Sequence, residues 1–150
     1  MKKILVFGFI LLLICTLVSC TNNKTYSLKE AGGFEISNIS GVSASESVYQ
    51  SSAWPISIDA YQYLDCKYIK VDFNIQEEYL SSWPSSEEKD DAYCLYVDVE
   101  NVDTYIEFGP IFYISHNTGY MYFDGIDGTY RSKNPVPNNF IEMIKADYYR

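Results

Sequence analysis

The sequence predicts an α+β domain in which a C-terminal amphipathic helix packs on a mainly antiparallel β-sheet. Three observations support this fold class. Apolar and polar residues alternate over 67–76 and over 93–102, which is the pattern of half-buried strands. Two further apolar runs, 111–115 and 120–123, flank the short turn 116–119 and predict a β-hairpin. One helical stripe closes a chain otherwise dominated by strands.

The segments before these strands show a weaker pattern. Residues 27–31 run into two glycines and are expected to form a loop. Residues 34–39 alternate and predict a first strand, and 54–64 predict a second, with Pro55 tolerated near its start. The serine-rich stretch 41–52 between them is typical of an exposed connection.

The end of the chain predicts a helix. Asn139 is a favourable N-cap residue, and Glu142 three residues later completes the pattern of a capping box. Phe140, Ile144 and Tyr148 then recur at helical spacing and form one apolar stripe. We expect this stripe to pack on the sheet.

The segment 77–91 separates the two clearest strands. Loops of this length inside a small domain are uncommon and are often functional. We therefore expect a contact surface made of Trp83 and Tyr79 from this segment and Tyr96 from the following strand. The acidic run at 87–91 is expected to be a solvated face of the same loop.

The first twenty residues have the composition of an export signal. Lys2 and Lys3 precede an apolar stretch, 4–17, that is shorter than the ~20 residues needed to cross a bilayer. Such a segment is typical of a removable signal peptide rather than a membrane helix. It ends in the residues Leu17-Val18-Ser19-Cys20.

This ending resembles the lipobox of bacterial lipoproteins. The resemblance implies that residues 1–19 are removed and that Cys20 carries a diacylglycerol, which would hold the chain on a membrane outside the cytoplasm. The alternative is an ordinary signal peptide cut near the same place, which would leave Cys20 as a free thiol. Thr21 stands where an aspartate commonly signals inner-membrane retention, so the cell membrane and the outer membrane both remain open, with a lean toward the outer.

Cleavage would leave a lipidated tether, 20–33, and a single α+β domain, 34–150. Without Lys2 and Lys3 the chain keeps 9 basic against 20 acidic residues, a net charge of −11. This charge argues against nucleic acid as a partner, and against docking on anionic headgroups through the protein surface. It suits solubility or a basic partner.

Two cysteines, Cys66 and Cys94, remain beyond the proposed anchor. An even pair in an exported protein suggests a disulfide. Both cysteines occupy the more polar parity of their predicted strands, as a cross-strand pair on neighbouring strands would require. The alternative is two reduced, partly buried thiols.

The sequence offers little for catalysis or metal binding. His116 is the only histidine and lies in a predicted turn, and no flanking motif pairs it with Cys66 or Cys94. One histidine and two cysteines that are candidates for a disulfide do not build a zinc site. Asp124 and Asp127 lack the spacing of a calcium-binding loop. No glycine-rich phosphate loop is present. We therefore expect no enzyme activity, metal or cofactor.

The leading hypothesis is a non-catalytic envelope lipoprotein that binds another protein or a cell-envelope ligand, or has a structural role there. A second hypothesis is toxin neutralisation, because residues 108–145 resemble the last third of SMI1/KNR4-type immunity domains, with 119–123 as a strand and 139–144 as the closing helix. That resemblance implies a toxin partner, and an acidic surface would suit a basic toxin site. A third hypothesis is a small hydrolase of envelope polymers, which requires two carboxylates around a cleft.

Overall fold

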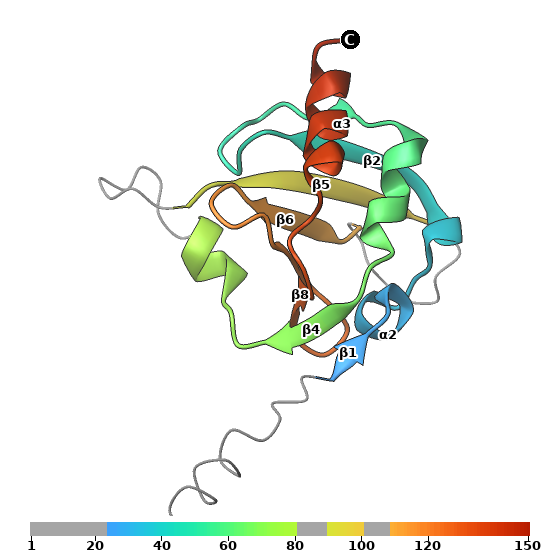
Figure 1. Cartoon of the computed structure of the whole chain (residues 1–150), viewed down its shortest axis with the longest axis vertical. Coiled ribbons are helices and arrows are strands. Elements are labelled where there is room, and N and C mark those ends of the chain that lie inside the picture. Colours follow the sequence, from blue (N-terminus) through green and yellow to red (C-terminus); the bar gives the residue numbers. More distant parts are fainter. Residues whose placement is uncertain (1–23, 81–89, 101–108) are drawn as a thin grey trace, which may run out of the picture.

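The structure is a computed structural model that describes residues 24–80, 90–100 and 109–150. These residues form one eight-stranded sheet in the order β1-β4-β8-β7-β6-β5-β2-β3, in which every neighbouring pair is antiparallel (Figure 1). The C-terminal helix α3 (Asn138–Tyr148) packs against one face of this sheet. The predicted α+β class is confirmed.

Four consecutive strands make the centre of the sheet. β5 (Ala92–Val99) pairs with β6 (Ile111–Ser115), β6 with β7 (Met121–Asp124), and β7 with β8 (Thr129–Ser132). The predicted hairpin is confirmed as β6 and β7, with Gly119 in its turn at a φ of +72°, a conformation that favours glycine. The sequence analysis did not identify β8, because four residues between a turn and two prolines give too short a pattern.

Short strands complete the sheet on both sides. β4 (Tyr68–Val71) covers only part of the strand expected at 67–76, and β1 (Thr25–Tyr26) pairs with it. On the other side, β2 (Ile39–Ser45) pairs with β5, and β3 (Trp54–Pro55) forms the opposite edge. Both edge strands are two residues long, which limits edge-to-edge pairing with other chains.

One face of the sheet, here called the helical face, carries the larger core. It is covered by α3, by α2 (Leu28–Gly32) and by the 3₁₀-helix η2 (Ile58–Leu64). The indole Nε1 of Trp54 donates to the Ile144 carbonyl oxygen at 3.0 Å and ties α3 to the sheet edge. The largest buried side chains of this core are Leu28, Leu64, Tyr68, Leu95, Phe112, Ile114, Met121, Phe123, Tyr130, Phe140 and Ile144.

The opposite face, here called the outer face, is covered by less structure. The first part of the expected 77–91 loop forms η3 (Gln76–Leu80), a single π-helical turn. The ring of Tyr79 stacks on Tyr113 at 5.6 Å between centroids, and Phe73 stacks on Tyr122 at 4.3 Å. The buried members of this smaller cluster are Ile75, Tyr79, Ala92, Cys94 and Tyr113.

The first ten described residues belong to the folded domain, which corrects the tether expected at 20–33. Ser27 Oγ accepts from the Glu30 backbone nitrogen at 3.2 Å, and Glu30 Oε2 accepts from the Ser27 nitrogen at 2.7 Å. This capping box starts α2 where a loop was expected. Leu28 and Ala31 are buried in the main core, so these residues contribute to folding.

The first predicted strand is misplaced. Residues 34–39 contain the 3₁₀ turn η1 (Ile36–Asn38), and the strand β2 begins where that prediction ends. Much of β2 lies in the stretch 41–52 that was expected to be an exposed connection. Val42 and Ala44 are buried and alternate with serines, but such small residues give a weak hydrophobic signal.

The second predicted strand is mostly a 3₁₀-helix. Only the first two residues of 54–64 pair as β3, and the rest form η2. Ala60, Tyr61 and Leu64 of η2 are buried, whereas Ile58, which shares the parity of Ala60, is 73% exposed. The Tyr61 hydroxyl accepts from the Val42 backbone nitrogen at 3.0 Å. The period-2 interpretation of this segment was therefore wrong.

The C-terminal helix starts one residue before the predicted N-cap Asn139. Pro137 occupies the N-cap position without a side-chain hydrogen bond, so the predicted capping box with Glu142 is wrong. Phe140 and Ile144 of the predicted apolar stripe are fully buried, whereas its third member, Tyr148, is 46% exposed and contacts the ring of Trp54 with 4.5 Å between centroids.

Candidate binding cleft

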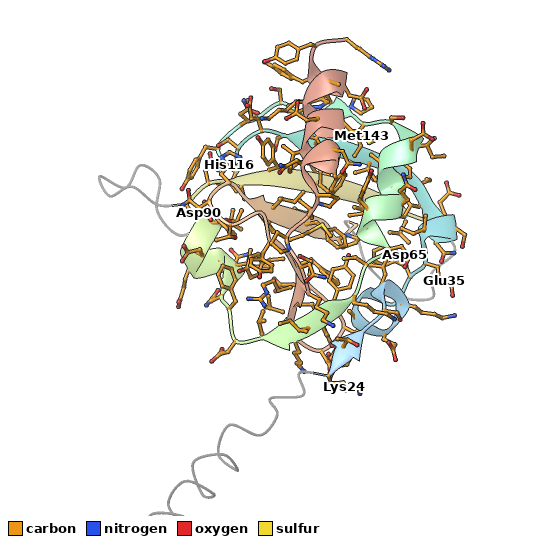
Figure 2. All side chains as sticks on the ribbon, in the orientation of Figure 1. Lys24, Glu35, Asp65, Asp90, His116 and Met143 are labelled. Atoms are coloured by element: carbon orange, nitrogen blue, oxygen red, sulfur yellow. The ribbon has the colours of Figure 1, made fainter. Side chains whose placement is uncertain are left out.

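An open cleft of about 420 Å³ lies between the end of η2 and the chain that connects β8 to α3. Asp65 lines the cleft and is labelled in Figure 2, where it marks the position of the cleft on the domain. The cleft is lined by Gln62, Tyr63, Asp65, Cys66, Lys67, Ser132, Lys133, Asn134, Pro135, Val136 and Pro137. Two chain segments that are far apart in the sequence therefore build it.

The aromatic wall of the cleft is held by α3. The Tyr63 ring stacks on Phe140, with 4.8 Å between centroids and 17° between planes. Asn139 Nδ2 donates to the Tyr63 hydroxyl, which explains why this asparagine does not cap the helix. Because Phe140 is fully buried, it fixes the position of the half-exposed Tyr63 ring.

The opposite wall is fixed by backbone hydrogen bonds. The Val136 nitrogen donates to the Gly119 carbonyl oxygen at 2.9 Å, and the Lys133 nitrogen donates to the Lys67 carbonyl oxygen at 2.7 Å. Proline on both sides of Val136 restricts the backbone further. The cleft is therefore formed before any ligand arrives, as most ligand sites are.

The rim of the cleft carries exposed polar groups. Gln62 and Asn134 offer amides, and Lys67 and Lys133 offer ammonium groups. Neither lysine forms an ion pair within the described part of the chain. The rim can therefore hydrogen-bond a partner and attract an acidic group on it.

Arg131 lies on β8 but does not line the cleft. It pairs with Tyr122, which belongs to the outer face, so its side chain projects away from the helical face on which η2 packs. Its guanidinium carbon is 4.2 Å from the centroid of the Tyr120 ring. Among the described residues, Arg131 Nε is the buried side-chain atom without a hydrogen-bond partner.

The thiol at the cleft is not built for nucleophilic chemistry. Burial raises the pKa of Cys66, so the thiol keeps its proton at neutral pH. Figure 2 shows His116 on the opposite side of the domain from Asp65, the residue that precedes Cys66. The alternative of a Cys66–His116 pair is therefore wrong. His116 is an exposed turn residue, as predicted.

The predicted disulfide does not form, since Cys66 and Cys94 are both free. Cys66 comes just before β4 and Cys94 lies in β5, and three strands separate these two in the sheet. That separation is about 19 Å along the sheet, far beyond the ~7 Å limit between bridged Cα atoms. Burial on the outer face raises the pKa of Cys94 to about 11.

The predicted contact surface is only partly accessible. Tyr79 is 2% exposed and packs beneath η3, so its ring is a core side chain and the expectation for it is wrong. Tyr96 is half-buried on the outer face beside the same cluster. Trp83 lies outside the described residues.

The acidic run expected to be solvated contains a structural carboxylate. Asp90 accepts hydrogen bonds from the hydroxyls of Ser115 and Tyr79, the latter at 3.4 Å, and from the Asn117 nitrogen at 3.1 Å. Asp91 accepts from the nitrogen of Val48 at 3.1 Å. The bonds of Asp90 connect the start of β5 to the β6–β7 turn, and the bond of Asp91 connects it to the segment between β2 and β3.

A neighbouring cleft of about 430 Å³ brings two carboxylates, Glu35 and Asp65, to one surface. Lys29 Nζ lies 2.8 Å from Glu35 Oε1, and both side chains are more than half exposed. This is the geometry of a solvated ion pair rather than of an acid–base pair around a substrate.

Across the described residues, no group of three or more His, Cys, Asp or Glu side chains is arranged to hold a metal ion. None of the described helices has the length and apolar character that a membrane span needs. Comparisons with protein-family models, curated proteins and solved structures find no match for this chain.

Proposed function

We propose that this chain is a lipid-anchored, non-catalytic binding protein of the cell envelope, and that the cleft beside Tyr63 receives its partner. The observation that carries the proposal is the cleft itself. Its walls are fixed by Phe140 and by the proline-flanked Val136, while its rim presents polar groups that are free to bind. A rigid cleft of this kind limits the ordering cost of binding.

The anchor rests on the sequence. Residues 17–20 resemble a lipobox, so Cys20 is the proposed site of lipidation, and the membrane is the first proposed partner. Lys24, four residues later, begins the described chain at an edge of the sheet (Figure 2). The proposed localisation is a cell membrane or outer membrane, with the domain outside the cytoplasm.

The second partner is proposed to be a protein or an envelope component with an acidic group. Lys67 and Lys133 stand at the rim of the cleft without an ion pair in the described part of the chain. A carboxylate or phosphate on the partner would satisfy these groups.

Photo-crosslinking in cells tests the binding site. A photoreactive residue replaces Gln62, which lines the cleft, in the natively anchored full chain, and a matched control replaces the exposed Ala146 on α3. We expect one dominant partner from position 62 that is absent from position 146. The yield should fall when Lys67 and Lys133 are both changed to Gln.

Identical products from both positions, or no specific product from position 62, would contradict the cleft as the binding site. The identity of the captured partner distinguishes the candidate roles. An envelope protein or polymer supports assembly or a structural role, whereas a toxin supports the immunity hypothesis.

A further inference from the structure

The start of the described chain and the tip of the β7–β8 hairpin lie together at one end of the sheet. β1 pairs with β4 through Thr25 and Ile69, so the same register places Lys24 opposite Lys70. Lys70 Nζ in turn lies 3.1 Å from Asp127 Oδ2 in the hairpin tip. The chain therefore enters the domain beside this tip.

The tip presents an exposed isoleucine. The side chain of Ile126 is 64% exposed, whereas its backbone nitrogen donates to the Ala31 carbonyl oxygen at 2.9 Å. A Cβ on the neighbouring Gly125 would lie 2.2 Å from the same Ala31 oxygen, so the tip packs closely on α2. The isoleucine is thus held outward by a fixed backbone rather than by a loose loop.

Groups suited to a lipid headgroup layer lie at the same end of the domain as Ile126. Lys24 Nζ lies 4.8 Å from the centroid of the Tyr26 ring, and Lys24 has no ion pair within the described residues. Lys70 is paired but its side chain is 44% exposed. Lysine and tyrosine are common at the level where a protein meets the headgroups.

The proposed anchor brings this end of the domain to the bilayer. Cys20 precedes Lys24 by four residues, which span at most about 14 Å when extended. An acyl chain on Cys20 would therefore keep Ile126 close to the headgroups at high effective concentration, so even a weak contact would be populated.

We propose that the end of the domain formed by Lys24, Lys70 and the hairpin tip docks on the membrane surface, with Ile126 inserted among the lipid headgroups. This proposal rests on the lipid anchor of the proposed function. The net charge of the whole chain disfavours anionic headgroups, so the docking depends on the anchor, on the exposed Ile126 and on the lysines at this end of the domain rather than on the charge of the whole surface. The docking also orients the cleft, because Lys67 stands at the start of β4 and Lys70 near its end. The cleft is then carried away from the bilayer, toward a partner.

Depth-dependent quenching tests the docking. The full chain is acylated in cells and reconstituted into vesicles of phosphatidylcholine and phosphatidylglycerol, in a Cys66→Ala, Cys94→Ala background. An environment-sensitive dye is attached at Ile126→Cys. The matched control is Ile58→Cys, which is 73% exposed and lies beside Ser57, whose nitrogen bonds Asp147 on the far C-terminal helix.

We expect lipids with a shallow nitroxide to quench the dye at position 126, with a blue shift, and to leave the dye at position 58 unchanged. If the chain floats with the vesicles but the dyes at positions 126 and 58 are quenched equally, or the dye at position 126 is not quenched, the docking is overturned. The anchor is left intact by either result. A chain that does not float refutes the anchor and the docking together.

Amide exchange provides a second readout in chains that keep both native thiols. Exchange in the β7–β8 hairpin should slow on vesicles relative to the unacylated Cys20→Ser chain, and Ile126→Asp should restore the solution rate. Unchanged exchange in the acylated chain on vesicles would overturn the docking as well.

Discussion

The two faces of the sheet are covered by different means. Three helical segments bury the helical face, where Phe140 and Ile144 are completely inaccessible. The outer face is covered by the single turn η3 and by rings such as Phe73 and Tyr122, which remain half-exposed. The helical face therefore holds most of the buried apolar area, and the outer face is a smaller, local addition to it.

A matched pair of substitutions measures this difference. Phe140→Ala should lower the free energy of unfolding by about 3–5 kcal/mol, since it opens a cavity in the main core and removes the support of Tyr63. Phe73→Ala, the same change on the outer face, should cost only about 1–2 kcal/mol because that ring is only partly buried and its removal opens no enclosed cavity. Denaturant unfolding of both variants gives the comparison, and equal losses would contradict the ranking of the two faces.

Alkaline pH should lower the free energy of unfolding, because a buried thiol on the outer face loses its proton. Burial raises the pKa of Cys94 from 9.0 to about 11, so the folded chain keeps a proton that the unfolded chain loses. The contribution is complete below pH 9 and disappears as pH rises to about 11, at a cost of up to about 2–3 kcal/mol. Cys94→Ala should show a smaller loss over this range, and parallel pH profiles of the two proteins would refute the prediction.

Weakening the hydrogen bonds that link β5 to the β6–β7 turn should have an intermediate effect on the free energy of unfolding. Asp90→Asn weakens the charge-assisted bonds from Ser115 and Asn117 and should cost about 1–2 kcal/mol. Asp72→Asn is the control, because Asp72 is exposed and has no such bonds among the described residues. Thermal unfolding should separate the two variants, whereas similar curves would mean that Asp90 acts only as a solvated charge.

The smallest effect is expected from a reductant. Cys66 and Cys94 are free and lie on strands that are not neighbours, so a reductant should leave the unfolding temperature of a Cys20→Ser chain unchanged. Thiol titration of a Cys20→Ser chain expressed from residue 20, and therefore without Cys15, should find both cysteines reactive after unfolding. A mass two protons lower, or a fall in the unfolding temperature on reduction, would show a bond that this fold does not accommodate.

The centre of the sheet was predictable and its sides were not. The β6–β7 hairpin was found because strongly apolar residues alternate on either side of a local turn. β2 was missed because Val42 and Ala44 are small, and η2 because a few alternating residues fit a strand as well as a 3₁₀-helix. The capping box of Ser27 and Glu30 favours a helix, but the two glycines that follow it led to the prediction of a loop.

Little of the candidate site was predictable, for a physical reason. The cleft joins residues 62–67 to residues 132–137, and only the sheet order brings these segments together. The same order separates Cys66 from Cys94. Cys94 lies in β5, whereas Cys66 precedes β4, and the parity of the two residues contained no information about which strands are neighbours. Net charge likewise could not show that Lys67 and Lys133 line the same cleft.

The most direct test of the central claim is the intact mass of the chain extracted from bacterial membranes. The account predicts a polypeptide that begins at Cys20 and carries a diacylglycerol on that residue, with additional acyl groups in some organisms. A Cys20→Ser chain should lose this mass and leave the membrane fraction. A chain that keeps its leader, or that begins at Cys20 without lipid, would contradict the claim that this domain is a membrane-anchored binding protein.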